Sequence, residues 1–149
     1  MRSPNILIRK GFTFIEMMIV LGIIAILATF GIIAGLDLYA RYNFRSEVDK
    51  AMAMLGRARS EAMNNISELP HGVYFADSQD LILFAGKDFA HRNSSYDLKI
   101  EKAKTASYTG ASEAIFSQLA GTTTAATVVV GDGIRSATII INYEGGIDY

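Results

Sequence analysis

The sequence predicts an α+β protein, in which one long N-terminal α-helix packs against a mostly antiparallel β-sheet head and has an apolar first half. Three features lead to this fold class. Residues 17–36 form an uncharged apolar run, residues 44–66 carry apolar side chains at helical spacing, and β-branched runs alternate with turn residues after Pro70. A length of 149 residues favours a single globular domain besides this helix.

The apolar run is long enough to cross a membrane. It contains 20 consecutive uncharged residues, Met17 to Leu36. At about 1.5 Å per residue such a helix spans roughly 30 Å, the thickness of the hydrocarbon core of a bilayer. Helices of soluble proteins are rarely apolar on all sides over this length. We therefore expect a transmembrane helix in contact with lipid.

The charges beside the run predict its orientation. Arg2, Arg9 and Lys10 precede it, and the first acidic residue is Glu16. The positive-inside rule then leaves the N-terminus in the cytoplasm and exports everything after Leu38. A secretory signal peptide has an apolar region of only about 7–15 residues, so a single-pass cytoplasmic (inner) membrane protein fits better.

The second half of the helix should cover the head with one face. No proline occurs between Pro4 and Pro70, so one helix over residues 12–66 is expected. Its apolar positions recur every three or four residues, which predicts a single buried stripe. These positions are Phe44, Val48, Ala51, Met52, Leu55, Ala58, Ala62 and Ile66.

Strands are predicted for the remainder of the chain. Residues 71–76 and 81–85 form a hairpin around a polar turn at 77–80, and residues 127–130 and 137–143 form a second hairpin around Gly131 and Gly133. Residues 96–102 alternate as a half-buried strand, 113–119 could be a short strand, and 88–95 and 122–126 are expected to be loops. The expected sheet has four to six strands.

The residues before the apolar run resemble a known signature. Residues 9–16 (RKGFTFIE), followed by about twenty apolar residues, resemble the cleavage and methylation signature of type IV pilins and type II secretion pseudopilins. The resemblance implies that a prepilin peptidase cuts between Gly11 and Phe12 and methylates the amine of Phe12. It also implies that Glu16 directs subunit assembly.

The same resemblance implies an organisation and a set of partners. Residues 1–11 would be the leader peptide, 12–38 the transmembrane or filament-core half of the helix, 39–66 its amphipathic half, and 67–149 the head. The implied partners are copies of the chain, other pilins or pseudopilins, the peptidase and an inner-membrane assembly platform. Residues 55–62 (LGRARSEA) and 139–146 (IIINYEGG) are similar to the minor pseudopilin branch. Many pilins carry a proline within the apolar helix, whereas this chain has Gly22, Gly31 and Gly35.

Two interpretations of Glu16 remain open from the residues. A carboxylate beside the hydrocarbon region costs a few kcal/mol unless it is paired or reaches the interface. The free amine of Phe12 on a neighbouring subunit could pair with it and set the register between subunits. Alternatively, Glu16 lies at a helix start, where the dipole favours acidic residues, and extends to the interface.

No enzymatic chemistry is indicated. His71 and His91 are isolated in the sequence, there is no cysteine, and no cofactor or metal site is expected. Scattered acids (Asp77, Asp80, Asp132 and Asp148) leave calcium as an alternative to solvated turn residues. The chain has 14 basic and 15 acidic residues, so its formal net charge is -1. Removal of the three basic leader residues would leave 11 basic and 15 acidic residues, a net charge of -4. Neither value gives a firm indication of nucleic acid binding.

The leading functional expectation is therefore a structural, non-enzymatic filament subunit, more in keeping with a minor pilin or pseudopilin than a major one. It would start in the inner membrane and end in an extracytoplasmic filament. The alternative is a single-pass membrane-anchored binding module that never polymerises. Replacement of Glu16 by Ala separates the two, because only a filament subunit depends on that carboxylate.

Overall fold

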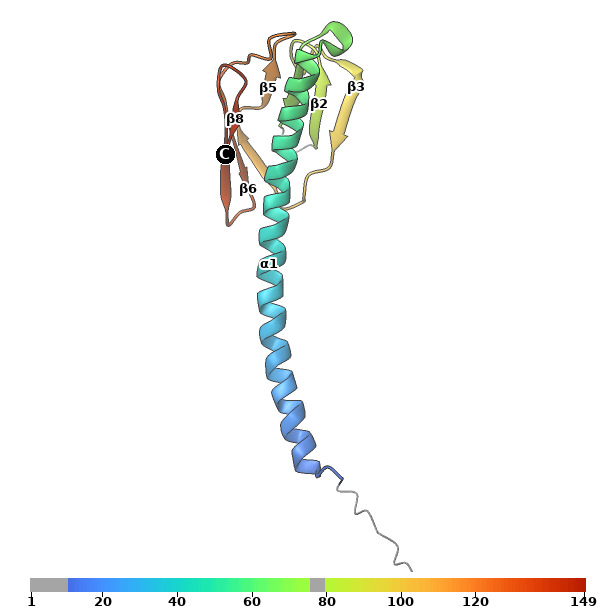
Figure 1. Ribbon diagram of the computed structural model, residues 1–149, viewed down its shortest axis with the longest axis vertical. Coiled ribbons are helices and arrows are strands. Elements are labelled where there is room, and N and C mark those ends of the chain that lie inside the picture. Colours follow the sequence, from blue (N-terminus) through green and yellow to red (C-terminus); the bar gives the residue numbers. More distant parts are fainter. Residues whose placement is uncertain (1–10, 76–79) are drawn as a thin grey trace, which may run out of the picture. The chain divides into compact units, whose positions relative to one another are not determined.

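The computed structural model describes residues 11–75 and 80–149. The dominant element is helix α1, Phe14–Met63 (Figure 1). The chain divides into two compact units, one ending at Ala40 and the other comprising Arg41–Tyr149. The α+β fold class predicted from the sequence is confirmed.

The first unit contains the N-terminal part of α1 and has no core of its own. Between Met17 and Ile32 the large apolar side chains are all exposed, from 44% at Val20 to 69% at Phe30. This part of α1 is long and apolar enough to cross a membrane, and none of it is buried inside the protein. Water is a poor solvent for such a surface, so lipid or another apolar chain must cover it.

The second unit is built around the C-terminal part of α1. The stripe facing the head consists of Val48, Ala51, Met54, Leu55, Ala58 and Ala62, each at most 2% exposed. These residues share one core with side chains from both sheets, including Val73, Leu83, Phe116, Val128 and Ile139. The predicted packing of an amphipathic half-helix on the head is thereby confirmed, with Met54 added to the stripe.

The first sheet has the strand order β3-β2-β1-β5, and all its pairs are antiparallel. The bounds are β1 His71–Tyr74, β2 Leu81–Ala85, β3 Asn93–Ile100 and β5 Glu113–Phe116. Strand β2 is buried throughout, because α1 covers one face and the loop after β2 covers the other. In that loop the ring of Phe89 stacks on Tyr74 and meets Phe84 edge to face.

The second sheet has the order β4-β6-β7-β8, again antiparallel. Its strands are β4 Ser107–Gly110, β6 Ala126–Gly131, β7 Ser136–Ile141 and β8 Ile147–Asp148. Strands β6 and β7 form the hairpin predicted around Gly131 and Gly133. Asp132 holds its turn by accepting hydrogen bonds from the backbone N–H groups of Ile134 (2.9 Å) and Arg135 (2.6 Å).

Several predicted boundaries were wrong. The described residues form two four-stranded sheets rather than one sheet of four to six strands. The β6–β7 hairpin pairs with β4 and β8, which were not expected, and not with a strand of the first sheet. Strand β3 begins at Asn93, inside the expected 88–95 loop, and ends at Ile100. Helix α1 starts at Phe14 rather than Phe12 and ends at Met63, after which a 3-10 turn covers Ile66–Glu68. Most of the predicted 77–80 turn lies outside the described residues.

Candidate functional site

The N-terminal end of α1 is organised by a capping box. Thr13 is the residue before the helix, and its Oγ1 accepts a hydrogen bond from the backbone N–H of Glu16 (3.3 Å). In return Glu16 Oε2 accepts from the backbone N–H of Thr13 (3.5 Å). A Thr and a Glu three residues apart satisfy two helix-end donors reciprocally, which determines where the helix begins. Gly11 and Phe12 precede it in non-helical conformation.

Only one oxygen of the Glu16 carboxylate takes part in the capping box. Its Oε2 makes the capping contact, and among the interactions of the described residues none involves Oε1. Glu16 and its neighbours are exposed, with Phe12 at 79% and Phe14 at 81%. An acidic group that faces outward among large apolar side chains can take a cationic partner from another molecule while it still caps its own helix.

The apolar part of α1 leaves no side-chain polar group unsatisfied. Thr29 is the only residue with a polar side chain in the 17–36 run, and its hydroxyl donates to the carbonyl of Ala25 (2.9 Å). Such internal pairing is what an apolar solvent requires. Beyond its own stretch of helix backbone, a Cβ added at Gly22, Gly31 or Gly35 would meet no atom of the described residues within 4 Å. Packing among the described residues therefore gives no reason for these glycines.

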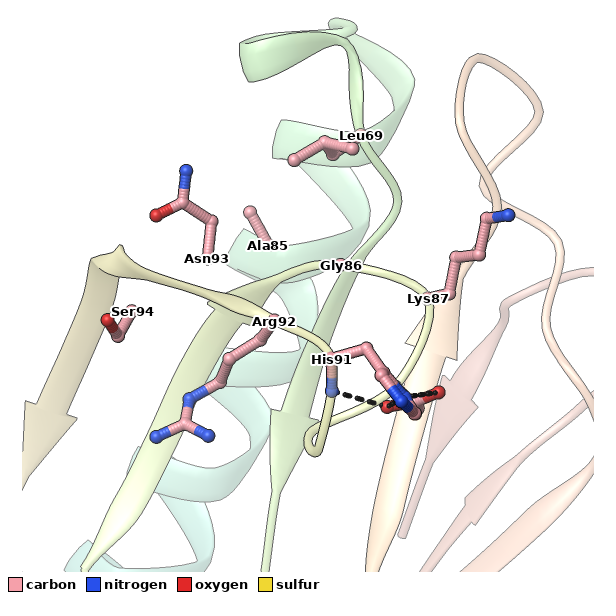
Figure 2. Close-up of a pocket in the computed structure, with 9 residues that line it drawn as sticks. Leu69, Ala85, Gly86, Lys87, His91, Arg92, Asn93 and Ser94 are labelled. Carbon is pink, nitrogen blue, oxygen red and sulfur yellow. Dashed lines mark hydrogen bonds and ion pairs between the residues drawn. The ribbon is translucent and has the colours of Figure 1, made fainter.

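The head contains a cavity of about 590 Å³ beside the loop after β2 (Figure 2). His91, which the sequence left isolated, here contacts Asp88: its backbone N–H and its ring Nδ1 both lie near the Asp88 carboxylate, at 2.7 and 2.9 Å. The hydrogen bond from the His91 ring holds the pKa of the Asp88 carboxyl below its usual range. The His91 side chain is 82% exposed, so the pair serves to close a surface turn. Leu69, Lys87 and Asn93 also line the cavity.

Two buried polar groups join α1 to the head. Glu47 is 3% exposed, and its carboxylate accepts from the Tyr108 hydroxyl (3.2 Å) and from Lys50 Nζ (2.5 Å). Burial and the nearby Glu47 carboxylate raise the pKa of Tyr108 far above its usual value. His71 is also buried: its Nδ1 lies 3.0 Å from the carbonyl of Leu69, and its Nε2 lies 3.7 Å from Glu61. Each histidine, isolated in the sequence, thus has an acidic neighbour in the folded chain: Glu61 for His71 and Asp88 for His91.

No metal-binding cluster is present in the described part of the chain, where no three His, Asp or Glu residues gather. Asp80 and Asp148 join no such group, Asp132 caps the β6–β7 turn, and Asp77 lies outside the described residues. Sequence reasoning missed the capping box, although the Thr-x-x-Glu spacing could have revealed it. It also missed the Glu47–Tyr108 contact, because the two residues are 61 positions apart.

Comparison with protein families gives one match. Residues 8–32 match the family described as the prokaryotic N-terminal methylation motif. The match covers 25 of 149 residues (8 to 32 inclusive), and it contains Gly11, Phe12, the capping box and most of the apolar run. The chain thus carries the N-terminal signature typical of type IV pilins and pseudopilins, a structural class. No curated protein and no solved structure matches the chain.

Proposed function

We propose that this chain is a structural subunit of a type IV pilus or a type II secretion-like filament, cleaved after Gly11, methylated at Phe12 and assembled through α1. The observation that carries the proposal is the methylation motif at residues 8–32, placed at the start of a helix whose apolar side chains have nothing to cover them. A filament core supplies that cover through neighbouring helices, and the bilayer supplies it before assembly.

The capping box suggests how Glu16 acts in assembly. Cleavage after Gly11 creates a charged amine on Phe12, one residue before the helix cap. Glu16 Oε1, which makes no contact among the described residues, can accept a hydrogen bond from this amine of an incoming neighbour while Oε2 remains on Thr13. A charge-assisted contact in an apolar surrounding is strong and sensitive to distance. Each subunit would then be held at one axial position relative to the next.

The proposal includes location and partners. The chain would begin as a single-pass inner membrane protein with residues 1–11 in the cytoplasm, where the prepilin peptidase acts. An assembly platform would then move it into the filament, where it meets copies of itself and other pilins. We assign it a minor rather than a major role on the resemblance of residues 55–62 and 139–146 to minor pseudopilins. No enzymatic activity is proposed.

The experiment compares three variants in cells that produce filaments. Glu16→Gln keeps the capping geometry, because glutamine also serves in a capping box, but it removes the charge. Thr13→Ala keeps the charge and weakens the cap by about 1 kcal/mol. Glu16→Ala removes the charge and the Glu16 half of the capping box, while Thr13 Oγ1 can still accept from the backbone N–H of residue 16. Sheared filaments and membranes are analysed by mass spectrometry for the chain and its N-terminal peptide.

We expect Thr13→Ala to enter filaments with an N-methylated Phe12, and both Glu16 variants to remain in the membrane. Normal incorporation of Glu16→Gln would show that the carboxylate only caps the helix. If even the unmodified chain stays in the membrane with residues 1–11 attached, it is an anchored module and not a filament subunit. The abundance of the processed peptide in the filaments distinguishes a minor from a major subunit.

A further inference from the structure

One end of the head combines exposed apolar side chains with unusual backbone conformations. Met63 and Ile66 at the end of α1 are each 47% exposed, and Leu119 from a separate loop is 66% exposed. The loop is joined to the helix end, because the backbone N–H of Leu119 donates to the carbonyl of Ala62 (2.9 Å). With the exposed acid Glu68, these residues form what we call the Leu119 patch.

Backbone strain is concentrated at this same place. Among the described residues, four that are not glycine have positive φ, and all four lie at the helix end or in the adjoining loop: Asn65 (55°), Ser67 (62°), Glu68 (54°) and Leu119 (66°). Left-handed conformations cost free energy for residues with a Cβ, and asparagine tolerates them best. A leucine in this conformation that also exposes its side chain gains little for the fold. Such outliers are characteristic of functional surfaces.

A surface of complementary chemistry lies at the other end of the head's helix. Tyr42 is 74% exposed, and Arg45, three residues later on the same helix face, is exposed as well. From Tyr42 to Met63 the helix advances 21 residues, or roughly 32 Å at 1.5 Å per residue. The Leu119 patch thus offers apolar side chains and an acid, and the Tyr42–Arg45 surface offers an aromatic side chain and a cation.

We propose that the Leu119 patch binds the Tyr42–Arg45 surface of a second copy of this chain. The aromatic ring of Tyr42 would cover Met63, Ile66 and Leu119, and Arg45 would pair with Glu68. The two surfaces are different, so the contact is heterologous and can repeat from copy to copy without closing. This inference rests on the proposed function and names the head surfaces that meet wherever two copies are neighbours, which requires only a few copies assembled together.

The absence of cysteine from the chain makes a direct test possible. Tyr42→Cys and Leu119→Cys are introduced together into the full chain in filament-producing cells, and the filaments are oxidised and separated without reductant. The contact predicts disulfide-linked dimers, with higher species where more than two copies follow one another, because each copy carries both halves of the link. Either substitution alone should give no such product. The matched control pairs Tyr42→Cys with Ile140→Cys, an exposed position on β7 (54%), and should give at least fivefold less product.

The other outcomes overturn the inference in distinguishable ways. If Leu119→Cys alone gives dimers as efficiently, the patch binds itself. If the control pair cross-links equally, the contact is not specific. Cross-linking of Leu119→Cys only to a different protein would make that protein the partner. If the double-cysteine chain is in filaments with a methylated Phe12 but no linked dimer forms, the surface assignment fails and the proposed function stands. If the unmodified chain is absent from filaments, both fail. If only the double-cysteine chain is absent, the two side chains are needed for incorporation, as the contact predicts.

A second variant separates binding from folding. Leu119→Gly relieves the positive φ and removes the exposed side chain, so the melting temperature should be unchanged or higher. Incorporation into filaments should nevertheless fall by at least fivefold. A leucine that merely supported the fold would give the opposite pair of results, a lower melting temperature with normal incorporation of the remaining folded protein.

Discussion

The buried contact between Glu47 and Tyr108 gives a quantitative test of how α1 is held on the head. Tyr108→Phe removes one hydrogen bond of 3.2 Å to a carboxylate that is 3% exposed. Hydrogen bonds to charged groups contribute about 1.5–3 kcal/mol, and the lower end applies because Glu47 keeps its contact with Lys50. We therefore expect a loss of about 1.5–2 kcal/mol.

The sample is the fragment 41–149, which contains the buried core side chains of the described residues. For about 100 residues the predicted loss lowers the melting temperature by roughly 6–12 °C. Urea unfolding should show the same loss of free energy with an unchanged slope.

A double-mutant cycle with Glu47→Leu isolates the contact. Glu47→Leu alone should cost more than Tyr108→Phe, because it leaves the Tyr108 hydroxyl buried without this acceptor. The double variant should recover at least about 1 kcal/mol relative to the sum of the two single losses. If the losses instead add to within about 0.3–0.5 kcal/mol, the two residues are not energetically coupled and the reasoning is refuted.

Two further predictions concern the same fragment. The raised pKa of Tyr108 means that above about pH 10 the unfolded chain binds fewer protons than the native one. Stability should therefore fall as pH rises from 9 to 11, and less steeply in Tyr108→Phe; equal slopes would contradict this. Gly72→Ala places a Cβ 2.7 Å from the Phe84 ring and 2.8 Å from the Ala114 carbonyl, which should cost about 1–3 kcal/mol in urea unfolding. Gly56→Ala is its control: it meets nothing within 4 Å on an exposed helix position and should stabilise by up to about 1 kcal/mol, so similar losses at both sites would contradict the packing argument.

The helical part of the fold could be predicted because its signals are local. Val48, Leu55 and Ala62 lie three or four residues from other apolar side chains, and all are buried as predicted. Ile66 continues that spacing but is 47% exposed, because Asn65 takes a left-handed conformation that ends the helix. The spacing of apolar residues indicates which face of a helix is apolar, but it does not indicate where the helix ends.

The strands that sequence reasoning missed have weak local signals. Strand β4, Ser107–Gly110, has a single buried residue, Tyr108, and is defined by its pairing with β6. Strand β8 is only two residues long and depends on β7. Such strands form because they pair with strands distant in sequence, and the residues next to them in the sequence carry no signal of that pairing.

The candidate site was predictable to the extent that it lies in one short segment. Gly11, Phe12 and Glu16 were selected from consecutive residues, and all fall within the matched motif. Their roles in cleavage, methylation and assembly stay predictions. The Leu119 patch could not be foreseen, since residues 63 and 119 meet only after the head has folded.

The capping box also bears on how a peptidase could meet this chain. Proteases bind their substrates in extended form, and a helix that began two residues earlier would bury the bond after Gly11 in hydrogen-bonded backbone. Thr13 prevents this because its side chain caps the first helical turn. The bond between Gly11 and Phe12 therefore lies in non-helical backbone, directly before a helix that is already formed. If the chain is processed as proposed, removal of the leader would require no refolding, and the product would leave the enzyme with its first helical turn already formed.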